Sequence, residues 1–421
     1  MKSYFEKIIR LKDGFAGSLA AYTFWGALDK VVPFILLPLF TRLFTKDDVG
    51  YYTLYQTLMI IIPPILTCDI DTSISINFFH YDKDKLSRLI FSSIIYVFVI
   101  YAIAMLIGFL LRESISDAMK FPYVEFAIII TNALFRLILS ILLCILRNEN
   151  KVLHYGMLSF SKTVISYGIS LYLIFRCSYS WRGVIYGEFC SGFIIAVLSF
   201  ILLYRKGYIK PVFEKILLKD SLMTGFPAAL HNIGAWLSNS FNSMLVNVLI
   251  GIGATGRYGV GATYGLIVSF VHTSINKAYS PYVYGCLKKK QMPKINTLIK
   301  KLYVLIIGIF IMVTLIGLTL NDYIFGDTYT DVKQFIVPLV LASTLWGLYK
   351  IHVAFLFYYK RVWSITKITI STGLLNIPIS YFLISNYALI GAAYASVISS
   401  VIIYIMIFLS SKKTLSKFYE D

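Results

Sequence analysis

The chain has 421 residues, of which 58% are hydrophobic and 14% charged, and its formal net charge is +18. Soluble domains usually carry about 25% charged residues, so this composition excludes an ordinary soluble domain and indicates an integral membrane protein. The five cysteines and five histidines show no paired or metal-ligand spacing. We therefore expect no disulfide, no metal site and no cofactor.

The predicted elements are apolar runs of roughly 20 residues, the length of a helix that crosses a bilayer. In chain order, the twelve predicted spans are residues 15–41, 51–77, 89–111, 123–146, 152–175, 183–204, 222–250, 257–285, 302–325, 335–358, 363–385 and 388–410. The segments between them are too short to fold as separate soluble domains. The predicted class is an all-α polytopic membrane protein.

Basic residues in the loops alternate between the two sides of the membrane. With the N-terminus in the cytoplasm, 25 Lys and Arg residues fall in inner tails and loops and eight in outer loops. Because basic residues accumulate on the cytoplasmic side, both termini are predicted to be cytoplasmic. The net charge then reflects orientation and contact with anionic membrane lipids, and we expect no nucleic-acid partner.

The two halves of the chain resemble each other. Shifted by 206 residues, LFTRLFTKDDVGYY pairs with LVNVLIGIGATGRY, and shifted by 208, GVIYGEFCSG pairs with GAAYASVISS. Each half holds six spans, and an even number keeps both copies in one orientation, as in two-lobed transporters. We predict an N-terminal six-helix lobe at 1–204, a cytoplasmic linker at 205–220 and a C-terminal six-helix lobe at 221–421.

Charged residues also fall at predicted membrane depth. The basic ones are Lys30, Arg136, Lys162, Lys277, Lys350 and Lys367, and the acidic ones are Asp29, Asp69, Asp71 and Glu188. A charge in the middle of a lipid-facing helix costs about 2.5–3.5 kcal/mol, so most should face a wet interior. Groups near span ends, such as Lys367, can instead reach the interface. A surplus of positive groups suits an anionic substrate, of which phosphate is the usual one.

Prolines interrupt the first two predicted spans, and another stands at the opening of the seventh. They are Pro33, Pro38, Pro63, Pro64 and Pro227. A proline frees a carbonyl and kinks its helix, which a moving bundle could use as a hinge and a static bundle would tolerate. The sequence leaves both readings open.

Several short motifs resemble Wzx-type polysaccharide flippases. The stretch PFILLPLFTRLFTKDDVGYYTLYQT (33–57) is similar to the family's first-loop signature, and INKAYSPYVY (275–284) to the end of its eighth span. One departure is that the family often has Ser-x-Asp-Arg where this chain has Ser240, Phe241 and Asn242. Any role of that charged pair is therefore absent here or has moved.

This resemblance implies the fold of the multidrug/oligosaccharidyl-lipid/polysaccharide (MOP) exporter superfamily, with two six-helix lobes in a V that opens alternately to each side. It implies a bacterial inner-membrane flippase without catalytic residues. Its substrate would be an undecaprenyl-pyrophosphate-linked oligosaccharide, an O-antigen or capsule repeat unit, moved from the cytoplasmic to the periplasmic leaflet. A polysaccharide polymerase and a chain-length regulator are candidate partner proteins.

Within this hypothesis the charged residues receive roles. The expected substrate-binding residues are Lys30, Arg136, Lys162, Lys277, Lys350 and Arg42. The expected ion-coupling or structural residues are Asp29, Asp69, Asp71 and Glu188. Two alternatives remain: a small-molecule exporter of the same superfamily, which would want a net acidic cavity, and a membrane-embedded polysaccharide polymerase, which would need a larger outer loop.

Overall fold

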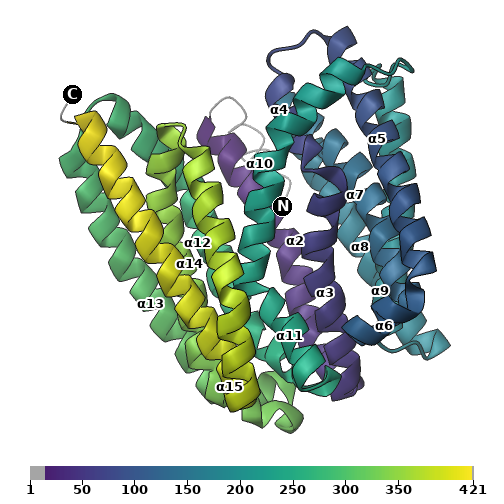
Figure 1. Ribbon diagram of the computed structural model, residues 1–421, viewed down its shortest axis with the longest axis vertical. Helices are drawn as coiled ribbons and strands as arrows, with labels where there is room; N and C mark the ends of the chain where they lie inside the picture. Colours follow the sequence, from purple (N-terminus) through teal and green to yellow (C-terminus); the bar gives the residue numbers. More distant parts are fainter. Residues whose placement is uncertain (1–14, 420–421) are drawn as a thin grey trace, which may run out of the picture. The chain divides into compact units, whose positions relative to one another are not determined.

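The structure, a computed structural model, describes residues 15–419, without the side chains of residues 15–20, 23, 278 and 417–419. In this part of the chain the backbone is helical except for short turns and connecting segments, and it forms no strand (Figure 1). The first helices are α2 (Phe15–Leu43), α3 (Lys46–Thr67), α4 (Ile70–Asn77), α5 (Lys83–Leu110), α6 (Arg112–Met119), α7 (Tyr123–Asn148), α8 (Val152–Cys177) and α9 (Trp181–Arg205). The later ones are α10 (Lys215–Asn239), α11 (Phe241–Leu249), α12 (Ile252–Lys288), α13 (Met292–Phe325), the 3-10 helix η2 (Asp327–Val332), α14 (Lys333–Tyr358) and α15 (Val362–Tyr419).

Nine helices in the described residues are long and apolar enough to cross a membrane. One of them, α15, contains the spans expected at 363–385 and 388–410, which meet at Ala388, where φ is 50° and ψ is −134°. The prediction of an all-α polytopic membrane protein is therefore confirmed. The spans expected at 222–250 and 257–285 fall in α10–α11 and α12, whose glycine, serine and asparagine residues make them more polar. That these two cross the membrane stays a prediction.

The span expected at 51–77 is wrong in its extent, because α3 ends at Thr67. Cys68 and Asp69 then adopt left-handed conformations with φ of 48° and 46°. Residues other than glycine seldom adopt this region, and a helix does not continue through it. The chain therefore turns, and the short α4 begins at Ile70.

The chain forms two compact units. Unit 1 comprises Met1–Leu37 and Leu58–Ala229, and unit 2 comprises Pro38–Thr57 and Leu230–Asp421. Three helices are therefore shared, since α2, α3 and α10 each begin in one unit and end in the other. The lobes expected at 1–204 and 221–421 are contiguous in sequence. They therefore differ from the observed units, each of which also contains a segment from the other half of the chain.

Unit 1 is built around α5, α7, α8 and α9, which lie side by side (Figure 1). Along α7, Leu137, Ile141 and Ile145 recur every four residues and form one buried face. Gly187 of α9 lies so close to α8 that an added Cβ would be 2.1 Å from Ser170 Oγ. Because lipid tails are as apolar as leucine, membrane helices depend on such close packing for their association.

In unit 2, Gly50 and Gly256, the equivalent glycines of the two repeated stretches, each pack against the helix that carries the other. A Cβ added at Gly50 would lie 2.0 Å from the carbonyl oxygen of Ile252, and one at Gly256 would lie 2.3 Å from that of Lys46. Lys46 and Ile252 are themselves equivalent under the shift of 206 residues. The glycine of each repeat therefore contacts the equivalent residue of the other repeat. Two copies related by a twofold axis make reciprocal contacts of this kind, which supports the internal repeat.

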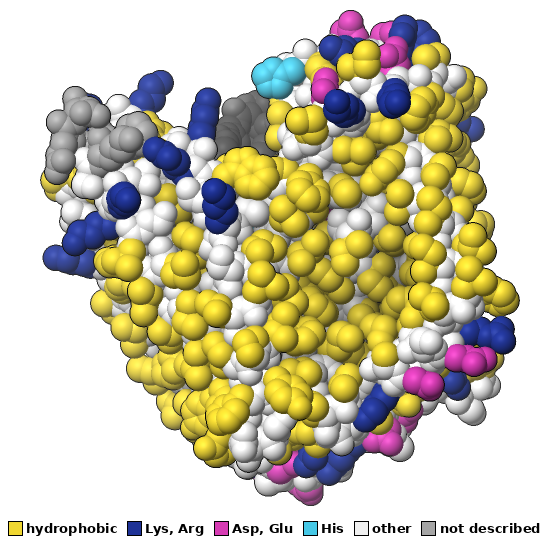
Figure 2. Space-filling model, in the orientation of Figure 1, with side chains coloured by type: hydrophobic (Ala, Val, Ile, Leu, Met, Phe, Trp, Pro, Cys, Tyr) yellow, Lys and Arg dark blue, Asp and Glu magenta, His cyan; other side chains and the backbone are white. Residues whose placement is uncertain are grey.

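The surface follows the pattern of lipid-facing helices. On the face drawn in Figure 2, basic and acidic side chains gather at the ends of the helices, and hydrophobic side chains cover the lengths between them. In unit 1, Phe98, Leu110 and Phe193 are each more than half exposed. Large exposed apolar side chains of this kind need a lipid environment.

Candidate functional site

Asp29, a predicted ion-coupling residue, lies half-buried on α2 in unit 1. Its carboxylate accepts hydrogen bonds from Ser159 Oγ and, at 3.4 Å, from Thr163 Oγ1. These hydroxyls are four residues apart on α8, so they share one helix face. Lys30 is exposed and has no polar partner among the described residues. The neighbours Asp29 and Lys30 thus have separate surroundings.

Lys162 and Glu188 form an ion pair between α8 and α9. Lys162 Nζ lies 2.9 Å from Glu188 Oε1, and the two side chains are 28% and 20% exposed. The pair joins a predicted substrate-binding residue to a predicted structural one. Lys162 is therefore neutralised within unit 1 by an acid 26 residues further along the chain.

Arg136 of α7 contacts the backbone of α3. Its Nη1 donates a hydrogen bond of 3.1 Å to the carbonyl oxygen of Met59. Met59 stands four residues before Pro63, which has no N–H to offer that carbonyl. Arg136 itself is exposed, and it has no acidic partner among the described residues.

The two other predicted acidic residues lie at the turn between α3 and α4. Asp69 precedes α4, and its carbonyl accepts from the amide of Thr72 at 3.0 Å. Asp71 follows in the first turn of α4, where a negative charge is favourable to the helix. Both lie at a break between two helices in unit 1, where the sequence predicted the cytoplasmic end of one continuous span, 51–77.

Arg42 and Lys277 belong to unit 2. Arg42 Nη2 donates to the carbonyl oxygen of Tyr323 at 2.7 Å. Tyr323 lies in the last turn of α13, where carbonyls lack helical partners, so Arg42 caps that helix. Lys277 is exposed on α12 and has no polar partner in the described part of the chain.

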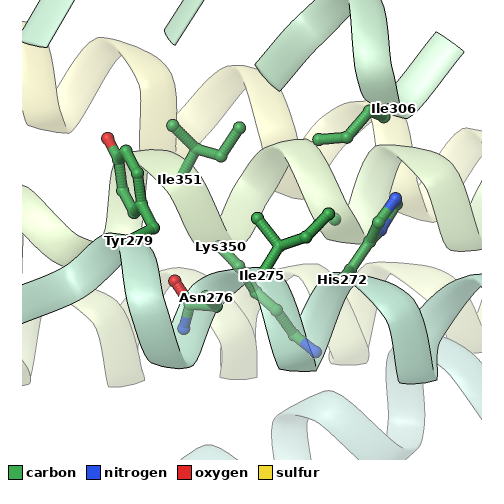
Figure 3. A pocket seen from close by; sticks show the side chains of 8 residues that line it. His272, Ile275, Asn276, Tyr279, Ile306, Lys350 and Ile351 are labelled. Atoms are coloured by element: carbon green, nitrogen blue, oxygen red, sulfur yellow. The ribbon is translucent and has the colours of Figure 1, made fainter. Parts of the chain in front are cut away.

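Lys350 of α14 lies at a small cavity in unit 2 (Figure 3). Its Nζ donates to Thr273 Oγ1 at 2.9 Å. The cavity has a volume of about 10 Å³, which holds about one water and excludes a sugar or a diphosphate. In Figure 3, His272 and Tyr279 of α12 lie on either side of Ile275 along its wall.

Two polar clusters were missed by the sequence prediction. Glu125, at the start of α7, is 2% exposed and accepts from Arg182 Nε at 2.6 Å. Asn242 is fully buried, accepts from Asn376 Nδ2 at 3.0 Å and donates to Ser396 Oγ at 2.8 Å. The only sequence signal for Asn242 was its departure from the flippase motif, and here a neutral amide joins α11 to α15.

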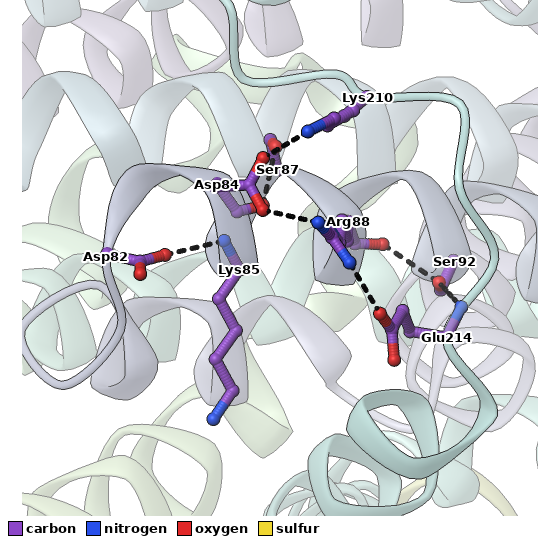
Figure 4. Close-up of polar contacts among 8 residues, drawn as sticks. All are labelled: Asp82, Asp84, Lys85, Ser87, Arg88, Ser92, Lys210 and Glu214. Carbon is purple, nitrogen blue, oxygen red and sulfur yellow. Dashed lines mark hydrogen bonds and ion pairs between the residues drawn. The ribbon is translucent and has the colours of Figure 1, made fainter.

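The segment between α9 and α10, predicted as a linker, is fastened to α5 by charges (Figure 4). Arg88 contacts Asp84 at 2.8 Å and Glu214 at 2.9 Å. Lys210 contacts Asp84 at 2.5 Å, and the amide of Glu214 donates to Ser92 Oγ at 2.8 Å. This segment is therefore held along unit 1.

A second cluster lies at the C-terminal ends of α7 and α9. Glu149, just after α7, accepts hydrogen bonds from Lys206 at 2.9 Å and Tyr208 at 2.8 Å, and contacts Lys151 at 2.8 Å. Burial alone would raise the pKa of Glu149, but these three partners outweigh it and hold that pKa at about 2.

The sequence matches known proteins along most of its length. The family model described as a polysaccharide biosynthesis protein matches residues 17–284. A Haemophilus influenzae protein named for its Lsg locus is 24% identical over 397 residues, covering 91% of this chain and 94% of that protein. A second Haemophilus influenzae protein, named an uncharacterized membrane protein, is 24% identical over 345 residues, covering 80% of this chain and 82% of its own.

Solved structures give the fold. An inward-facing multidrug resistance MATE family transporter of the MOP superfamily has a TM-score of 0.74 and 13% identity, covering 94% of this chain and 96% of its own. A MOP superfamily transporter from Pyrococcus furiosus has a TM-score of 0.66 and 13% identity, covering 97% and 98%. The chain thus has the MOP transporter fold, and the resemblance to Wzx-type polysaccharide flippases is confirmed. By the family match over more than half of its length, the chain belongs to the polysaccharide biosynthesis protein family.

Proposed function

We propose that the protein is a flippase for an undecaprenyl-pyrophosphate-linked oligosaccharide, an O-antigen or capsule repeat unit. It moves the substrate from the cytoplasmic to the periplasmic leaflet by alternating access through a cationic cavity. The diphosphate and sugars occupy this cationic cavity, which is not the small cavity at Lys350, while the polyprenyl tail stays in the bilayer. No covalent bond changes in this step, so the chain needs binding groups and movement and no catalytic residue.

The observation that carries the proposal is the surplus of exposed basic groups at predicted membrane depth. Lys30 and Lys277 are exposed, without an acidic partner among the described residues. Two of the four acids at predicted depth are engaged, since Glu188 pairs with Lys162 and Asp29 accepts from two hydroxyls. The other two, Asp69 and Asp71, lie at the turn between α3 and α4. A surplus of this sign attracts a diphosphate and repels a cationic drug.

Export assays of charge-neutral variants test this proposal. Lys30→Gln and Lys277→Gln should each lower export about tenfold or more at normal protein level, because a hydrogen bond to a charged group contributes about 1.5–3 kcal/mol. Lys367→Gln is the matched control, since Lys367 is an exposed lysine near the start of its predicted span. Normal export by both first variants would contradict the anionic-substrate assignment.

We assign the coupling role to Asp29, because its carboxylate and the hydroxyls of Ser159 and Thr163 form an oxygen set that suits a proton or a small cation. Asp29→Asn should keep the protein level and abolish the response of export to a proton or sodium gradient. A gradient response unchanged from wild type would assign Asp29 a structural role only.

The proposed location is the bacterial inner membrane, with both termini in the cytoplasm. Reporter fusions after Lys290 and after Asp331 should report the cytoplasm and the periplasm, respectively. The same compartment at both sites would contradict the twelve-span topology.

A further inference from the structure

The hydrogen bond between Arg136 and Met59 has a specific chemical origin. In a regular helix, the carbonyl of residue 59 accepts from the amide of residue 63. Here both residue 63 and residue 64 are prolines, so neither the usual donor nor the next one along has an N–H. Met59 is 7% exposed, so water has little access to its freed carbonyl. The guanidinium of Arg136 takes the place of the missing amide.

A neighbouring contact on α3 provides a comparison. Trp236 Nε1 of α10 donates at 2.8 Å to the carbonyl oxygen of Thr57. Four residues on stands Ile61, which has an N–H, so Thr57 keeps its helical donor and the tryptophan adds a second one. The Met59 carbonyl therefore depends on Arg136 for its hydrogen bond, whereas the Thr57 carbonyl does not depend on Trp236.

The guanidinium of Arg136 has donors to spare. Arginine carries five N–H groups in a planar fork, and one hydrogen bond of Arg136 goes to Met59. Its side chain is exposed at predicted membrane depth, within the same unit as the proline pair. Two parallel N–H groups are the preferred partner of a phosphate, and a bidentate bond of that kind is stronger than a single bond to a neutral carbonyl.

We propose that Arg136 is a positioning residue shared between α3 and the substrate. In the empty transporter it closes the gap that Pro63 leaves in α3, and a phosphate-bearing headgroup competes for its guanidinium. Binding of the headgroup then frees the Met59 carbonyl and loosens α3 at its proline pair, a few residues after α3 passes from unit 2 to unit 1. The second half of this inference rests on the proposed anionic substrate, and the first half does not.

The first test is a double-mutant cycle on thermal stability, with the purified full chain in detergent and no ligand. Arg136→Met should lower the melting temperature by about 2–4 °C in the wild-type background. In the Pro63→Ala background it should lower it by less than about 1 °C, because an alanine at position 63 returns the amide that Met59 needs. Trp236→Phe, the control, should have the same effect in both backgrounds. Equal losses from Arg136→Met in both backgrounds would overturn the proposal.

The second test uses inorganic pyrophosphate as the probe and amide hydrogen exchange of residues 59–67 as the readout. Pyrophosphate should speed exchange severalfold in the wild type, relative to chloride at the same ionic strength. Arg136→Met should exchange quickly without pyrophosphate and show no further response. If Pro63→Ala does not fold, this exchange experiment still tests the proposal, because it needs only the wild type and Arg136→Met.

Unchanged exchange in the wild type, or an equal response in Arg136→Met, would overturn the competition. Either result would leave the flippase assignment intact, because that assignment is tested by export. Conversely, loss of the anionic substrate would leave the result of the stability cycle unchanged.

Discussion

The ion pair between Lys162 and Glu188 separates a structural role from a substrate-binding role. Removing one partner of a buried pair costs about 3–5 kcal/mol, because the remaining charge is left uncompensated. At 28% and 20% exposure, the pair is partly accessible, so we expect about 2 kcal/mol for Glu188→Gln. The unfolding entropy grows with chain length, and for 421 residues it gives a shift of about 1 °C per kcal/mol, so the melting temperature should fall by about 2 °C.

The double variant Lys162→Met with Glu188→Gln removes both charges. It should recover most of the lost stability, since no buried charge remains unpaired. Thermal unfolding of the purified protein in detergent and export in cells are measured on the same set of variants. A double variant as unstable as Glu188→Gln would refute the account of the pair. A stable double variant that exports at the wild-type rate would remove Lys162 from the substrate-binding residues and leave it a structural one.

Three further predictions concern packing, polarity and pH. Gly256→Ala should lower the melting temperature by several degrees, because its Cβ would lie 2.3 Å from the Lys46 carbonyl oxygen. A variant as stable as wild type would contradict the close contact between the repeats. Asn242→Asp should reduce the amount of folded protein more than Asn242→Ser does, since a carboxylate would be fully buried among neutral partners. Equal levels of the two would contradict this. Glu149→Gln should lower the melting temperature at pH 7 and by much less at pH 3. Its folded pKa of about 2 is below the ordinary 4.5, so its contribution is full above pH 4.5 and is lost as pH falls toward 2. An equal loss at both pH values would contradict this reasoning.

The fold class could be predicted because it depends on local composition. Runs of roughly 20 apolar residues specify spanning helices wherever they occur, and α5, α7, α8 and α9 lie close to the predicted ranges. The breaks were harder to predict. Ala388 and the pair Cys68 and Asp69 have positive φ angles, yet none is a glycine, and only tertiary packing over-determines such conformations.

The candidate site was predicted residue by residue, and its pairings were not. Lys162 contacts Glu188, 26 residues away in the sequence, and Arg136 contacts Met59, 77 residues away. A single sequence does not show which of its distant residues are in contact. Glu125 was missed because it stands two residues inside a helix start, where an acid is ordinary. The sequence also did not predict that α2, α3 and α10 each begin in one unit and end in the other. The apolar pattern of each of these helices continues across the boundary, so nothing in it marks the change of unit.

Reconstitution into liposomes tests the central claim most directly. A fluorescent undecaprenyl-pyrophosphate oligosaccharide is placed in both leaflets, and an impermeant quencher is added outside. If the protein is a flippase, vesicles that contain it should lose nearly all fluorescence as the inner pool reaches the outer leaflet, and protein-free vesicles should retain about half. Equal quenching in the two kinds of vesicle, with the protein shown to be folded, would contradict the account.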